Sequence, residues 1–134
     1  MEPRLLLDTH IVIRWLLEPR KLSKAQLGAL EAAVRRGEPV AISATSLIEI
    51  AVLASEEKPR INVHLGQFLA DLDSNPVFRI LPITCEIATE VGALGGSLRD
   101  PADRTIVATA RVHRLRLVTS DQRIIESKLA SLVE

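Results

Sequence analysis

Two aspartates lie at the ends of predicted strands, where a parallel sheet commonly binds ligands. Asp8 directly follows the apolar run "LLL", and Asp121 follows "LVTS", so each comes at the end of a segment typical of a buried strand. In an open parallel sheet, ligands bind beyond the carboxyl ends of the strands. Neighbouring strands lie only roughly 5 Å apart, so the two carboxylates could share one cation if their strands are neighbours. Either aspartate could instead cap the helix that follows it.

Two further acids lie in predicted helices. Glu49 is the only charged residue of "SLIEIAVLA", and burying an unpaired carboxylate costs several kcal/mol unless it is neutralised, paired or bound to a metal. A salt bridge to an arginine and a solvent-exposed helix face are the alternatives. Asp103 lies in the first turn of a helix that "DPAD" predicts, with Asp100 as N-cap and Pro101 as first residue. Asp103 could bind a metal or simply stabilise that helix terminus through the macrodipole.

Converging carboxylates of this kind favour a hard divalent cation. Without a lysine or arginine among them they would repel one another and raise one another's pKa values, and a cation removes that conflict. Oxygen ligands suit Mg²⁺ or Mn²⁺, whereas the three histidines lack zinc-site spacing. Hydroxyl groups that could orient the acids, or cap helices themselves, belong to Thr9, Ser43, Thr119 and Ser120.

Strands and helices must alternate to position these residues. Short apolar runs predict strands at 4–8, 39–43, 78–83 and 115–121, and helices are predicted at 9–18, 23–36, 44–57, roughly 62–72, 84–94, 101–114 and 122–130. The second helix carries a capping box, in which Ser23 and Gln26 cap each other's backbone. The alternation predicts one α/β domain over residues 1–134, with three α/β/α layers around a mainly parallel sheet of four to five strands.

Composition limits the class of protein. Seventeen basic and seventeen acidic side chains cancel, so net charge does not indicate a nucleic-acid partner, although thirteen of the basic residues are arginine. The lone Cys85 cannot form an internal disulfide, and its apolar neighbours predict a buried thiol. We expect a cytoplasmic protein, because the chain shows neither a signal-peptide pattern nor an apolar run that could span a membrane.

Four motifs in order resemble the PIN-domain ribonucleases, and more narrowly the VapC-type toxins. They are "LLLDTH", "SATSLIEIA", "RDPADRTIVATA" and "LVTSD", and the resemblance they carry extends over nearly the whole chain. The resemblance implies a Mg²⁺- or Mn²⁺-dependent endoribonuclease, the toxin of a type II toxin–antitoxin pair, which cleaves RNA phosphodiesters through metal-activated water. It also implies a cognate antitoxin and a homodimer. Its catalytic and metal-binding residues would be Asp8, Glu49, Asp103 and Asp121, with Asp100 as a further candidate ligand.

Two further sets of residues are candidates for binding partners. Arginines near the acids could contact RNA phosphate groups, namely Arg14, Arg99 and Arg104. An apolar set in the first helix could form a dimer face or an antitoxin groove, or could pack in the core: Ile11, Val12, Trp15 and Leu16.

Other functional classes fit the sequence less well. A haloacid-dehalogenase-like phosphatase needs a second aspartate two positions after the first, where this chain has His10. A response-regulator receiver needs a lysine after a late strand, and all four lysines lie elsewhere. The remaining alternative is a catalytically silent PIN-like module that only binds a protein partner.

Overall fold

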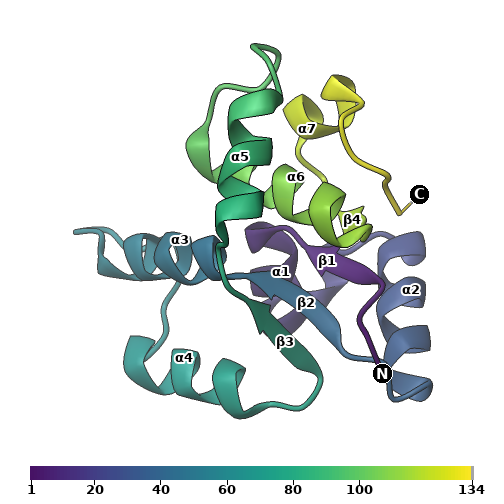
Figure 1. The fold of residues 1–134 in the computed structure, drawn as a ribbon. Coiled ribbons are helices and arrows are strands. Elements are labelled where there is room, and N and C mark those ends of the chain that lie inside the picture. Colours follow the sequence, from purple (N-terminus) through teal and green to yellow (C-terminus); the bar gives the residue numbers. More distant parts are fainter. Residues whose placement is uncertain (134) are drawn as a thin grey trace.

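Four parallel strands form the centre of the molecule. The computed structural model describes residues 1–133, with strands β1 (Leu5–Leu7), β2 (Val40–Ser43), β3 (Phe78–Leu81) and β4 (Arg116–Val118). Their order across the sheet is β3-β2-β1-β4, and each neighbouring pair is parallel (Figure 1). The predicted parallel sheet is confirmed, and β1, which carries Asp8 at its end, lies between β2 and β4.

Seven α-helices connect and flank the strands. They are α1 (Thr9–Leu17), α2 (Lys24–Arg35), α3 (Ala44–Ser55), α4 (Leu65–Ser74), α5 (Cys85–Ala93), α6 (Pro101–His113) and α7 (Gln122–Ser127), and a 3₁₀ turn, η1 (Pro19–Lys21), follows α1. The capping box of Ser23 and Gln26 is present at the start of α2. Helix α4 begins three residues later and ends two residues later than its predicted range of roughly 62–72. Among residues 1–133, no helix has the length and apolar character needed to cross a bilayer.

The alternation of side chains along the strands creates two cores. Leu5 and Leu7 pack with residues of α1 and α2 on one face of the sheet, whereas Leu6 packs with residues of α5 and α6 on the other. Every residue of β1 is therefore buried, as the continuous apolar run predicts. The result is the three-layer α/β/α arrangement visible in Figure 1.

The apolar residues of α1 serve mainly the core. Ile11 and Val12 are fully buried, and Trp15 packs edge-on against Phe78 with 5.7 Å between the ring centroids. Leu16 alone of the four is exposed, at 40%. Core packing thus accounts for three of these residues and leaves Leu16 available to a partner.

The prediction of a buried Cys85 is wrong. Cys85 is the first residue of α5, and its side chain is exposed. Helix α5 buries only Ile87, so apolar neighbours in the sequence do not place the thiol on the buried face of the helix.

Candidate active site

The carboxyl ends of β1 and β4 bring the first and last acidic motifs together. Leu7 pairs with Val118, so Asp8 and Thr119 occupy the next row beyond the sheet. The backbone N–H of Asp8 donates to the carbonyl of Val118 at 3.0 Å. The condition stated from the sequence, that these two strands are neighbours, is therefore met.

Asp8 is buried and oriented by a hydroxyl group. Thr119 Oγ1 donates to Asp8 Oδ2 at 2.7 Å, and only 5% of Asp8 is exposed. Burial raises the pKa of Asp8 above its ordinary value, although the hydrogen bond from Thr119 opposes that rise. Asp8 occupies the N-cap position of α1, but its side chain makes no capping hydrogen bond. The helix-capping interpretation of its carboxylate is thus not supported.

Glu49 reaches the same region from α3. Thr9 Oγ1 donates to Glu49 Oε1, and Ser46 Oγ lies 2.7 Å from Thr9 Oγ1. Because Thr9 has one hydroxyl proton and gives it to Glu49, Ser46 must donate to Thr9. No salt bridge to Glu49 forms within residues 1–133, which removes its main alternative role. Burial raises the pKa of Glu49, and the charges of Asp8 and Asp100 raise it further.

Asp100 and Asp103 have different environments at the start of α6. Asp100 Oδ1 accepts from the N–H groups of Ala102 and Asp103 at 2.8 and 3.1 Å, which is the predicted N-cap. Asp103 is 8% exposed, and its Oδ2 has no hydrogen-bond partner within the described chain. Burial, together with the charges of Asp100, Asp121 and Asp8, raises the pKa of Asp103 to about 6.

Asp121 caps α7 and pairs with an arginine that sequence reasoning missed. Its Oδ1 accepts from the backbone N–H of Arg123 at 2.9 Å, and Arg123 Nη2 lies 3.3 Å from its Oδ2. Burial acts to raise the pKa of Asp121, but the hydrogen bonds from Arg123 outweigh it and lower the pKa. The same Nη2 lies 3.7 Å from Asp103 Oδ2. The premise that no arginine accompanies the acids is therefore wrong, although the Arg123 side chain remains 71% exposed.

The four candidate hydroxyl groups divide into two pairs. Thr9 and Thr119 contact Glu49 and Asp8 directly. Ser43 instead caps α3 by accepting from Thr45 N–H at 3.2 Å. Ser120 Oγ accepts from the side chain of Gln26 at 2.9 Å. Of the residues sequence reasoning missed, Ser46 carried no signal beyond its position, and Gln26 was assigned only to the capping box.

The candidate acids influence one another's pKa values, and their negative charge favours binding of a cation. Burial and mutual repulsion raise three of their four pKa values, and the buried Asp103 Oδ2 makes no hydrogen bond within the described residues, with Arg123 Nη2 3.7 Å away. Glu38 Oε1 is also buried without a hydrogen bond, but Glu38 has two closer cations, because Arg4 Nε and Arg36 Nη2 each lie 3.2 Å from one of its oxygens. With the side chains of residues 1–133 in their present positions, no three Asp, Glu, His or Cys side chains are close enough together to hold one ion. The oxygen-only donor set, with a negative charge that Arg123 compensates only in part, fits Mg²⁺ or Mn²⁺.

The arginines near the acids have unequal roles. Arg99 lines a cavity of about 220 Å³ together with Asp100, Asp103 and Arg123. Arg14 lines a separate hollow of about 170 Å³ beside His10. The proposed phosphate role of Arg104 is contradicted, because its guanidinium donates to the carbonyls of three residues and holds the segment before α6. Those carbonyls belong to Val91, Gly95 and Leu98.

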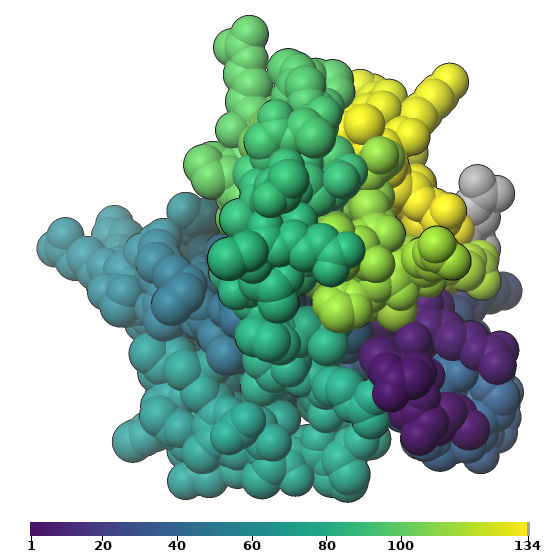
Figure 2. Space-filling view, in the orientation of Figure 1, coloured from purple at the N-terminus to yellow at the C-terminus, as the bar shows by residue number. Residues whose placement is uncertain are grey.

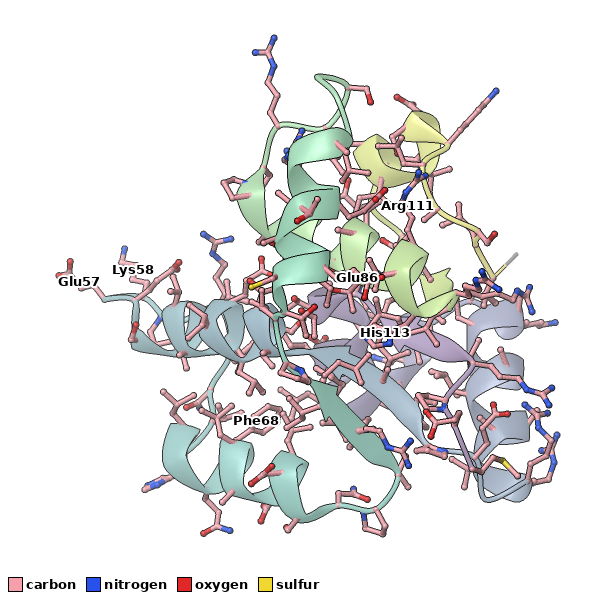
Figure 3. All side chains as sticks on the ribbon, viewed as in Figure 1. Glu57, Lys58, Phe68, Glu86, Arg111 and His113 are labelled. Atoms are coloured by element: carbon pink, nitrogen blue, oxygen red, sulfur yellow. The ribbon has the colours of Figure 1, made fainter. Side chains whose placement is uncertain are left out.

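Three further arginines lie on another surface. Arg111, Arg114 and Arg116 line a hollow of about 800 Å³ between α5, α6 and the C-terminal residues. Figure 3 labels Arg111 and Glu86 on this side of the molecule. Arg111 Nε is paired with Glu90 at 2.7 Å. These three arginines therefore line a hollow that contains none of the four candidate acids.

Comparison with known proteins identifies a family that matches most of the chain. The PIN domain family matches residues 5–128. Over 120 residues the chain is 38% identical to Ribonuclease VapC22 of Mycobacterium tuberculosis, covering 89% of this chain and 88% of that protein.

Solved structures show the same fold. The VapBC2 complex of Rickettsia felis, bound to a DNA fragment from its promoter, matches with a TM-score of 0.71 and 18% identity over 98% of this chain and 97% of the other. A toxin–antitoxin complex of Klebsiella pneumoniae matches with a TM-score of 0.60 and 28% identity over 87% and 86%.

Proposed function

Because this chain belongs to the PIN-domain family, we propose that it is the ribonuclease toxin of a toxin–antitoxin pair and cleaves RNA with Mg²⁺ or Mn²⁺. The observation that supports this proposal most is the environment of Asp103: burial and the charges of Asp100, Asp121 and Asp8 raise its pKa to about 6, and its buried Oδ2 makes no hydrogen bond within the described residues. The relative named as a ribonuclease and the toxin–antitoxin complexes support the activity and the partner class.

The metal would be held by Asp8, Glu49, Asp103 and Asp121. A bound divalent cation supplies a water of lowered pKa and stabilises the charge that develops on the phosphodiester. Thr119 and Thr9 hold Asp8 and Glu49 in fixed orientations, which reduces the reorganisation required to bind. Arg123 compensates part of the charge of Asp103 and Asp121 when no cation is bound.

Arginine side chains on either side of the acids would bind the RNA backbone. Arg99 lines the cavity that contains Asp103, so it lies close to where a scissile phosphate would sit. Arg14 lines a separate hollow that it shares with His10, where it would contact the RNA backbone farther from the acids. Planar guanidinium groups suit phosphate oxygens. Two isolated arginines and a neutral chain imply that RNA affinity is modest and depends on salt.

Asp100 is expected to act as a helix cap and not as a metal ligand. Asn caps a helix as well as Asp does, so Asp100→Asn should leave the RNA cleavage rate within about twofold of the wild type. Asp100→Ala removes the acceptor for two N–H groups and should lower the free energy of unfolding by about 1 kcal/mol. Cleavage and urea unfolding would be measured on both variants. A tenfold slower Asp100→Asn enzyme would make Asp100 a ligand.

A homodimer is part of the proposal, and α3 offers a surface for it. Ile48 and Val52 are 67% and 54% exposed and lie one turn apart, and the end of α3 with the residues after it projects from the body of the molecule (Figure 2). Changing both to Glu should weaken dimerisation by at least about tenfold, as judged by light scattering across a concentration series. Val34→Glu, an exposed apolar position on α2, is the matched control. An unchanged mass for the double variant would exclude this face.

Growth of a host tests toxicity directly. Expression of the chain without a partner should arrest growth, and Asp8→Asn should relieve the arrest at equal protein level. Equal growth of both strains would contradict the proposed toxicity. It would favour the alternative, a catalytically silent PIN-like module that binds a protein partner. An RNA substrate and a single unpaired thiol also fit the cytoplasmic location expected from the sequence.

A further inference from the structure

Gln26 uses every hydrogen-bonding group of its amide. Gln26 is only 7% exposed at the third position of α2, where its Oε1 accepts from Ser23 N–H at 3.0 Å. Its Nε2 donates to the carbonyl of Thr119 at 3.3 Å and to Ser120 Oγ at 2.9 Å. The capping box needs only the oxygen. The two donor contacts, made to residues more than ninety positions away, therefore go beyond what the helix requires.

The segment that Gln26 holds orients two of the candidate ligands. Thr119 Oγ1 donates to Asp8 Oδ2 at 2.7 Å and accepts from the backbone N–H of Asp121 at 3.0 Å. Asp8 and Asp121 come from opposite ends of the chain, and this one hydroxyl group bridges them. A shift of the Thr119 backbone would therefore move the donor to Asp8 and the start of α7 together.

We infer that Gln26 is a positioning residue for the metal site: it fixes the Thr119–Ser120 segment, and through it Asp8 and Asp121. The inference rests on the proposed function in so far as those acids hold the metal. A neutral amide suits this position, because it donates to a carbonyl without adding charge beside four carboxylates. Residues that orient the groups bound to a metal commonly change metal affinity by 10- to 100-fold when they are replaced.

Two variants separate positioning from helix capping. Gln26→Glu keeps the oxygen that caps Ser23 N–H but removes both Nε2 donors. Ser23→Ala removes the reciprocal capping hydrogen bond, which the backbone N–H of Gln26 donates to Ser23 Oγ, and leaves the Nε2 donors in place. Gln26→Met, which removes all amide contacts at similar volume, serves if the Glu variant does not fold. Mn²⁺ affinity would be measured by calorimetry on each folded protein.

A positioning role and a purely electrostatic effect predict opposite changes in the Mn²⁺ affinity of Gln26→Glu. An added carboxylate beside the acids would by itself strengthen Mn²⁺ binding. Loss of positioning should instead weaken binding by roughly tenfold, whereas Ser23→Ala should change it less than twofold even though it lowers thermal stability. Binding by Gln26→Glu that is as tight as or tighter than that of the wild type would overturn the inference. An equal loss in Ser23→Ala would also overturn it.

Amide hydrogen exchange provides a readout that does not need the metal. The backbone N–H of Asp121 donates to Thr119 Oγ1. Its hydrogen should exchange roughly fivefold faster in Gln26→Glu and at the wild-type rate in Ser23→Ala. A wild-type protein that binds no Mn²⁺ would contradict the proposed function, and the exchange rates would then still decide the positioning role. Unchanged exchange in Gln26→Glu would refute that role.

Discussion

Replacing Asp8 with Asn is expected to weaken Mn²⁺ binding by more than about 100-fold without unfolding the protein. Asp8 is the central acid of the site, because β1 lies between β2 and β4 and its carboxylate is held by Thr119. The oxygen of Asn can still accept the hydrogen bond from Thr119, so the fold retains that contact while the negative charge is lost. Calorimetric titration and circular dichroism would measure the two effects.

A matched control distinguishes loss of a ligand from loss of net charge. Asp73→Asn removes one exposed carboxylate from α4, a helix that contributes none of the four acids, and should leave Mn²⁺ affinity unchanged within about twofold. Equal weakening by both substitutions would mean that Mn²⁺ is attracted by the general charge of the protein. It would remove the argument for a defined site at Asp8.

Asp103→Asn is expected to abolish activity yet to stabilise the metal-free protein at pH 7 by about 1–2 kcal/mol. The pKa of Asp103 is raised to about 6 by burial and by neighbouring acids, so the folded state disfavours its charged form. Its favourable contribution is present below the unfolded-state pKa and is lost as pH rises through about 6. Partial solvent access and Arg123 reduce the full cost, which is why the expected gain is modest.

Urea unfolding in the presence of a chelator would test this at several pH values. The stability advantage of Asp103→Asn over the wild type should be small near pH 4, grow through pH 6 and level off above it. Measuring the difference between the two proteins removes the titration of groups that both share. An advantage that does not change with pH would show that the unpartnered Asp103 oxygen is not the source of strain.

Much of the fold could be predicted because the local patterns agree with the tertiary structure. Continuous apolar runs correctly predict the fully buried strands β1 and β2, and the alternation of strands and helices predicts the parallel sheet. The helix caps at Ser23 and Asp100 depend only on residues two or three positions away, so the sequence predicts them correctly. The meeting of Asp8 and Asp121 required only that β1 and β4 be neighbours.

What failed depended on contacts between distant residues. Arg104 resembles a free cation in the sequence, but its carbonyl partners come from the end of α5 and the loop that follows it. The exposure of Cys85 depends on which face α5 turns to α6. Arg123 lies beside Asp103, twenty positions away, and Gln26 donates to Thr119, so neither contact has a local pattern in the sequence.

Cleavage of labelled RNA by the purified protein tests the central claim most directly. Wild-type protein should cleave when Mg²⁺ or Mn²⁺ is present and stop when a chelator is added, and Asp8→Asn from the same preparation should be at least about 100-fold slower. Cleavage that persists in excess chelator, or that is equal in both proteins, would contradict a metal-dependent site built from these four acids.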